Sequence, residues 1–189
     1  MKRFWTVLLL AALLLPASAL ALTGQTYDAF SANYTDNVTF INDNDNRHLM
    51  PLVLSQRTGD DGSLYYELFG DVLNVTVNTD LSGVIKSCLV MLNAPANMEY
   101  GTATYNDFAI SGYHSYAFLM AMDTSAEPAD RYALVTDVVQ GMAASADGTY
   151  TRQLGVYTLT CNRVDQTAIL DFVNNGVPVE TPTPDPNAP

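Results

Sequence analysis

Apolar and polar residues alternate along several stretches of this chain in the pattern of a β-strand. Within residues 72–78, Leu73, Val75 and Val77 alternate with asparagine and threonine. A period of two places one set of side chains on a buried face of a sheet and the other set on a wet face. This alternation, or a high content of β-branched and aromatic residues, predicts strands at residues 64–69, 72–78, 84–92, 149–154, 156–163 and 167–173.

A helical spacing of apolar residues appears before the first strands. Tyr27, Phe30 and Tyr34 recur along one side of a helix, and Thr26 precedes them as an N-cap. We expect a short amphipathic helix there. The cluster of asparagine and aspartate at residues 42–46 predicts a turn between two short extended or irregular segments.

Two further helices are expected in the middle of the chain. Residues 107–122 carry apolar side chains around most of the helix circumference, which favours a buried helix. In residues 124–148, Thr124 and Glu127 form a capping-box pattern ahead of apolar residues at helical spacing. The order of helix, three strands, two helices and three strands predicts an α+β fold. We expect an antiparallel sheet of about five to seven strands, with two or three helices packed on one face.

The two groups of strands resemble each other weakly. Residues 61–63 (Asp-Gly-Ser) precede one group, and residues 147–149 (Asp-Gly-Thr) begin the other. Their middle strands carry Val-Thr-Val-Asn at residues 75–78 and Leu-Thr-Cys-Asn at residues 159–162. A duplicated helix-plus-three-strand unit would produce this similarity. The turns that separate the strands of any antiparallel sheet would also produce it. The sequence leaves both interpretations open.

The first residues have the features of an export signal. Lys2 and Arg3 precede an apolar run at residues 4–15, and a small-residue series containing Ala19 and Ala21 follows as a peptidase site. The apolar run is too short for a stable membrane span. We therefore expect a signal peptide at residues 1–21 and no membrane anchor after its removal. The mature protein is expected to be secreted or to reside in the cell-envelope space.

Composition divides the rest of the chain into a folded part and a tail. Hydrophobic residues make up 48% of the chain, which is enough to form a core. The length suits a single α+β domain at residues 22–176. Beyond it, prolines are interspersed with threonine and acidic residues, so residues 177–189 are expected to form a disordered, proline-rich acidic tail.

The chain is strongly acidic, because 20 aspartates and glutamates face 8 lysines and arginines and give a net charge of −12. Nucleic acids and anionic membranes bind through basic patches that release counterions, so both are poor partners for this chain. We expect a monomer whose acidity keeps it soluble outside the cell, with a protein or a glycan as its partner.

Cys88 and Cys161 are the two cysteines of a chain that we expect to be exported. Disulfides persist in oxidising compartments, so a bond between Cys88 and Cys161 is the expected arrangement. Two free, buried thiols are the alternative. Neither cysteine is next to a histidine or within a C-x-x-C motif, so cysteine-based catalysis is not expected.

The sequence offers no motif for a metal or a cofactor. With only His48 and His114, a zinc site made of three histidines is excluded. An EF-hand that began at Asp43 would need glycine and a carboxylate where the chain has His48 and Leu54. Phosphate-binding glycine loops are also missing, so we expect neither a metal nor a cofactor.

These observations favour a secreted, non-catalytic binding domain whose ligand is a protein or a cell-surface glycan. The candidate binding surface consists of Tyr65, Tyr66, Asn42, Asp43, Asp45 and His48. Two alternatives remain. One is a small secreted hydrolase that uses His114 or His48 with a carboxylate. The other is a secreted protein inhibitor that presents the turn at residues 42–46 or at residues 60–62.

Overall fold

The computed structural model describes residues 24–96, 98–125 and 127–176. The predicted signal peptide at residues 1–21 and the predicted tail at residues 177–189 lie outside the described residues. The elements of the described chain are, in order, α2 (Tyr27–Asp45), β1 (Ser55–Thr58), β2 (Leu64–Phe69), β3 (Leu73–Thr79), β4 (Ile85–Asn93), α3 (Ala103–Ala121), α4 (Pro128–Ala144), β5 (Tyr150–Leu154), β6 (Tyr157–Val164) and β7 (Thr167–Asn174).

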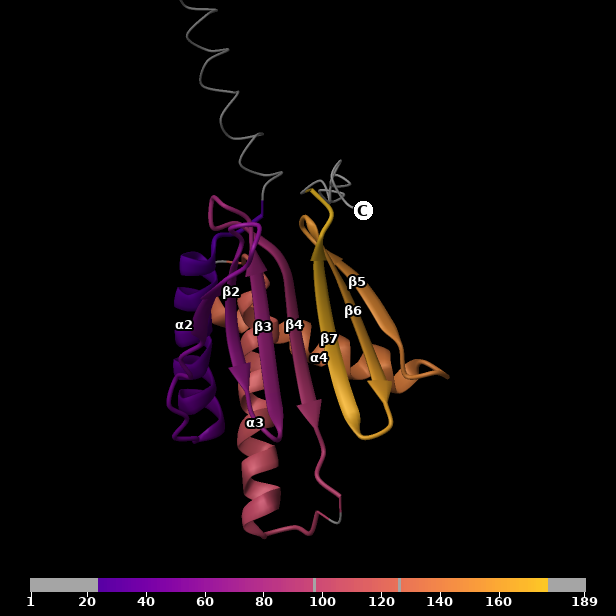
Figure 1. Cartoon of the computed structure of the whole chain (residues 1–189). Coiled ribbons are helices and arrows are strands. Elements are labelled where there is room, and N and C mark those ends of the chain that lie inside the picture. Colours follow the sequence, from indigo (N-terminus) through magenta and orange to yellow (C-terminus); the bar gives the residue numbers. More distant parts are fainter. Residues whose placement is uncertain (1–23, 97, 126, 177–189) are drawn as a thin grey trace, which may run out of the picture.

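The strands form one antiparallel sheet in the order β1-β2-β3-β4-β7-β6-β5. The helices of the described chain pack against one face of this sheet, and Figure 1 shows none of them on the other face. We call these the covered face and the uncovered face. The α+β fold expected from the sequence, with an antiparallel sheet and helices on one side, is confirmed.

Alternation along the strands decides which side chains the helices cover. In β3, Leu73, Val75 and Val77 are buried, whereas the asparagines and the threonine between them are only half-buried. The second half of α3 completes the core from the other side. Phe118 is fully buried there, and its ring stacks on that of Tyr34 with 4.1 Å between the centroids.

The two halves of the sheet, β2-β3-β4 and β5-β6-β7, pair their strands in the same register. Two matching cross-strand rows are Tyr66–Val77–Cys88 and Tyr150–Cys161–Leu170. The halves meet where β4 pairs with β7, and there Leu89 lies opposite Asp171. This repetition of β2-β3-β4 by β5-β6-β7 is what the interpretation as two helix-plus-three-strand units predicts.

Helix α2 is longer than expected and includes most of the predicted turn at residues 42–46. Val38 and Ile41 continue the buried stripe that Phe30 begins, so packing against the core keeps the chain helical. The helix ends at the C-cap Asn46, which adopts a left-handed backbone with φ of 50°. Residues 42–45 therefore do not form the projecting loop that the inhibitor hypothesis requires.

The helix caps agree only in part with the sequence prediction. Thr26 is the N-cap of α2 as expected, and its hydroxyl accepts the N–H of Ala29 at 3.3 Å. The capping box predicted for Thr124 and Glu127 is wrong. Helix α4 instead begins at Pro128, with Glu127 as an N-cap that makes no side-chain capping bond. Proline favours the first helical turn because it lacks the N–H that would be unpaired there.

Strand β1 was missed by the sequence analysis because Ser55–Thr58 is polar and exposed along its length. It pairs with β2, where Arg57 forms an ion pair with Glu67 at 3.0 Å. At the opposite edge of the sheet, Arg152 of β5 is ion-paired with Asp137 of α4. Both edge strands thus carry an arginine held by a carboxylate.

The expected disulfide is not formed, since Cys88 and Cys161 are both free and buried. Strand β7 lies between β4 and β6, which carry the two cysteines. Two interstrand spacings amount to roughly 9–10 Å, beyond the limit of about 7 Å between Cα atoms that a disulfide allows. Burial also raises the pKa of Cys88, and it raises the pKa of Cys161 to about 12, so both remain protonated, unreactive thiols.

Candidate functional site

Strand β2 directs its two adjacent tyrosines to opposite faces of the sheet. Tyr66 lies on the covered face and stacks on Tyr27, with 3.3 Å between the ring centroids. Tyr65 lies on the uncovered face, where the guanidinium carbon of Arg57 is 4.4 Å from its ring centroid. Successive residues of a strand point in opposite directions, so the two tyrosines do not share one binding surface.

The other residues of the predicted surface lie in and after the last turns of α2. Asn42 donates to the carbonyl oxygen of Leu49 at 3.0 Å and accepts the N–H of Leu49 at 2.7 Å, which fixes the segment after the helix. Asp43 and His48 are exposed, and Asp45 is half-buried. The six predicted residues are divided between this helix end and the two faces of β2, so the structure does not bring them together.

His114 is buried in α3 and contacts a tyrosine. Its Nδ1 lies 2.9 Å from the hydroxyl of Tyr34, and that hydroxyl accepts the N–H of Leu52 at 3.1 Å. The tautomer of the imidazole decides whether Nδ1 accepts a hydrogen bond from this hydroxyl or donates one to it. Among the residues with described positions, neither His114 nor His48 pairs with a carboxylate, so the arrangement that would support a hydrolase is missing.

We expect His114 to make the protein less stable in mild acid. Burial lowers the pKa of His114 below the ordinary value of 6.5. In mild acid the imidazole is therefore protonated more in the unfolded state than in the folded state. The free energy of unfolding is therefore unaffected by His114 above pH 6.5. It falls as the pH drops below 6.5, by at most about 1.4 kcal/mol per pH unit.

Urea denaturation at pH 7.5, 6.5 and 5.5 checks this prediction. The variant His114→Gln does not titrate, so it should lose the part of the pH dependence that His114 supplies. The matched change at the exposed histidine, His48→Gln, should keep it. Equal pH profiles for the wild type and His114→Gln would refute the prediction.

The uncovered face carries an apolar centre. Leu89 and Met91 of β4 lie directly opposite Asp171 and Ile169 of β7, and Val173 extends the row on β7. We call Leu89, Met91, Ile169 and Val173 the apolar stripe. Val173 is 42% exposed and the other three are half-buried, although none of the described helices lies over them. The junction of the two halves of the sheet is thus apolar on both faces.

Short polar side chains flank the apolar stripe on both sides. These polar flanks are Asn74, Thr76 and Asn78 on β3, and Thr158, Thr160 and Asn162 on β6. The Oδ1 atoms of Asn78 and Asn162 are buried and have no hydrogen-bond partner within the described structure. Two acceptors at matching places in the two halves therefore remain to be satisfied by water or by a ligand.

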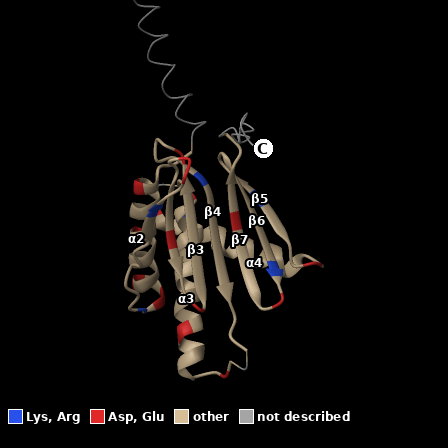
Figure 2. Cartoon of the chain, viewed as in Figure 1, with Lys and Arg blue, Asp and Glu red and all other residues tan. Residues whose placement is uncertain are grey.

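Asp171 places a carboxylate inside this apolar centre. It faces Leu89 on one side and Thr160 on the other. In the described part of the chain, its side chain makes no ion pair, and desolvation by burial raises its pKa. Figure 2 shows it as the acidic segment of β7. A charge held in this environment without a counter-charge destabilises the free protein.

We expect Asp171→Asn to stabilise the isolated protein at pH 7. The amide keeps the shape and removes the charge, and the gain should be at most about 1 kcal/mol because the side chain is partly solvated. Because the folded-state pKa is raised, wild-type stability relative to the variant improves as the pH falls through that pKa. The difference should disappear below the unfolded value of 3.8.

Denaturant midpoints of both proteins at pH 7 and pH 3.5 measure this effect. The control is Asp130→Asn in the first turn of α4, where a carboxylate favours the helix dipole and its loss should bring no gain. A variant Asp171→Asn that is less stable than the wild type at pH 7 would contradict the prediction.

Sequence reasoning did not find this site, although one signal was present. Residues 167–173 read as an apolar strand, and Asp171 is the charged residue in it. Within the described ranges, histidine, cysteine and acidic residues do not gather in groups of three that could hold a metal ion. The described helices also include none that is long and apolar enough to cross a membrane.

The uncovered face therefore combines an apolar stripe, two polar flanks and an unpaired carboxylate, and its arrangement is suited to binding. Comparison of the chain with known protein families, curated proteins and solved structures finds no match.

Proposed function

We propose that this chain is a secreted, non-catalytic binding domain that docks a protein partner on the uncovered face of its sheet. The apolar stripe supplies the centre of the interface, and the polar flanks supply its rim. An apolar centre within a polar rim is the usual anatomy of a protein–protein interface. The observation that carries the proposal is the desolvated carboxylate of Asp171, which lacks a counter-charge at the centre of this face.

The composition of the face favours a protein over a glycan. Four aliphatic side chains lie at its centre, whereas the aromatic residues Tyr65 and Phe69 lie toward the edge of the sheet on β2. A glycan would place hydroxyl groups against the aliphatic stripe and would gain little from burying it. A protein can cover the stripe with its own apolar side chains.

The carboxylate also indicates what the partner presents. Asp171 requires a hydrogen-bond donor or a cation, and the unpaired Oδ1 atoms of Asn78 and Asn162 also accept hydrogen bonds. A lysine or arginine of the partner would satisfy Asp171 and would be attracted by the net charge of −12. The partner is therefore a protein with a basic residue within an apolar patch.

Affinity capture with matched variants tests this proposal. The wild-type protein and the variants Ile169→Lys, Asp171→Asn and Thr136→Lys are each used to capture material from the extracellular medium of the source. The change at Thr136, an exposed residue of α4, adds the same charge on the helical side and should leave capture intact. Ile169→Lys should reduce capture about tenfold or more, because it places a charge within the apolar stripe.

Asp171→Asn separates binding from stability, because it should weaken capture while stabilising the free protein. Retained material that is destroyed by protease supports a protein partner. Retained material that is destroyed by periodate and resists protease overturns the choice of a protein. Undiminished capture by Ile169→Lys would show that the uncovered face is not the binding surface.

A further inference from the structure

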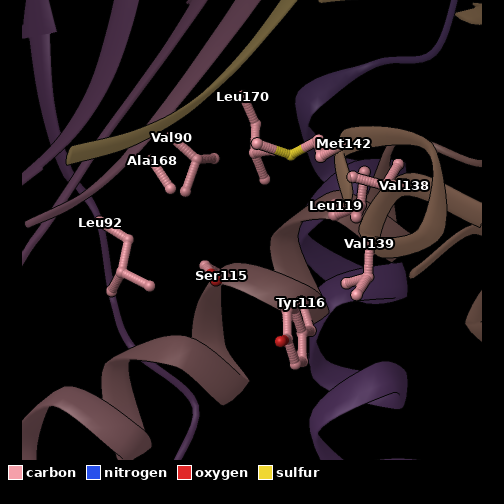
Figure 3. Close-up of a pocket in the computed structure, with 10 residues that line it drawn as sticks. All are labelled: Val90, Leu92, Ser115, Tyr116, Leu119, Val138, Val139, Met142, Ala168 and Leu170. Carbon is pink, nitrogen blue, oxygen red and sulfur yellow. The ribbon is translucent and has the colours of Figure 1, made fainter. Parts of the chain in front are cut away.

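The covered side of the sheet contains a pocket that the proposed interface does not use. It lies between α3, α4 and the junction of β4 with β7, and its volume is about 160 Å³. Figure 3 shows Val90 and Leu170 of the strands on one side and Leu119 and Val138 of the helices on the other. These side chains belong to the buried core, so the pocket is an unfilled part of that core.

Small residues at facing positions leave this space open. Ala168 of β7 and Ser115 of α3 both line the pocket. Larger side chains at these positions would close the gap, so the sequence itself accounts for the opening.

The lining of the pocket offers few hydrogen bonds to water and no partner to a charged ligand. Its two hydroxyl groups belong to Ser115 and Tyr116, and the first already donates to the carbonyl oxygen of Gly112 at 2.7 Å. A buried water needs two to four polar partners, which this lining does not provide. No charged residue lines the pocket, and the net charge of −12 repels anions while a cation would find no counter-charge inside.

We infer that this pocket binds a small, uncharged hydrocarbon group, either an aromatic ring or a short aliphatic chain. A dry apolar cavity of about 150 Å³ in another protein is large enough for benzene, so about 160 Å³ admits a group of this size. Val139 of α4 lines the pocket and is 49% exposed, so the pocket opens to solvent beside this residue.

Thermal unfolding of the full chain with and without toluene tests the inference. Toluene at several times its dissociation constant should raise the unfolding midpoint by about 2–4 °C. Benzylamine has a similar ring with a positive charge and should produce no shift. A wild-type protein that shows no saturable response to toluene would overturn the inference.

A pocket-filling variant identifies where the ligand binds. Ala168→Leu should fill the pocket, leave the unfolding midpoint unchanged or higher, and abolish the toluene-induced shift. The control Ala133→Leu, on the exposed side of α4, should keep the shift. A toluene-induced shift that persists in Ala168→Leu would place the ligand elsewhere and refute the assignment.

Val139→Phe provides a second readout at the mouth of the pocket, should Ala168→Leu fail to fold. The larger ring narrows the entrance at a partly exposed position and should reduce toluene binding. Unchanged binding in this variant would also count against the inference. The pocket and the uncovered face lie on opposite sides of the sheet, so the two proposals can fail independently.

Discussion

Phe118→Ala is expected to lower the free energy of unfolding by about 3–5 kcal/mol. The side chain is fully buried in α3, where its ring lies 4.1 Å from that of Tyr34 and 6.1 Å from that of Phe30, measured between centroids. Removing it leaves a cavity where α2 meets α3, and two other rings lose their stacking partner. A domain of this size is commonly stable by only about 5–15 kcal/mol, so the variant should lose a large part of its stability.

The matched control for this change is Phe69→Ala in β2. Phe69 is 69% exposed on the uncovered face, so its removal should cost less than about 1 kcal/mol. Urea denaturation of the two variants measures both values. A difference of less than about 1 kcal/mol between them would contradict the placement of Phe118 at the centre of the core.

The two glycines inside helices are expected to respond to alanine in opposite directions. At Gly141 of α4, an added Cβ would overlap the ring of Tyr150 and lie 2.8 Å from its Cγ. Because the base of the ring is involved, rotation of the ring tip cannot relieve the overlap. Tyr150 must shift from its place against the core, so Gly141→Ala should lower the free energy of unfolding by about 1–3 kcal/mol.

Gly112 of α3 has open space where the Cβ would lie. Alanine is favoured over glycine within a helix, so Gly112→Ala should raise the free energy of unfolding by about 0.5–1 kcal/mol. Denaturant unfolding of the two variants under identical conditions compares them directly. If both changes alter stability in the same direction, the packing described for α4 against β5 is incorrect.

The period of the apolar residues is enough to predict most of the sheet. The alternation of Leu73, Val75 and Val77 places β3 correctly and also identifies the covered face. The same rule fails at Val38 and Ile41, because β-branched residues followed by asparagine and aspartate are also typical of a strand before a turn. Only contact with the core keeps these two residues in α2, and a local pattern does not include that contact.

The distance between the two cysteines is a second feature that the sequence does not predict. Both lie on the covered face, as the alternation around Cys88 and Cys161 indicates. Their separation depends on the strand order β4-β7-β6, which inserts β7 between them. Strand order is a property of the whole chain, so the spacing of two residues in the sequence does not predict it.

The proposed binding surface was missed for a related reason. Adjacent tyrosines such as Tyr65 and Tyr66 attract attention as a pair, yet the pleat of β2 separates them. In the sequence, Asp171 has no neighbour that marks it as part of a site. Only the folded sheet places it opposite Leu89, across the junction of the two halves. A site formed by cross-strand neighbours requires the register of β4 and β7, which is known only from the folded chain.

The arginines of the two edge strands bear on whether the sheets of two molecules can pair at their edges. An edge strand presents unpaired backbone groups that can recruit another chain, and charged side chains on that strand oppose such pairing. Arg57 on β1 and Arg152 on β5 are positioned by carboxylates at the two ends of the sheet. We therefore expect these two arginines to hinder fibril growth through the edges of the sheet in concentrated solution.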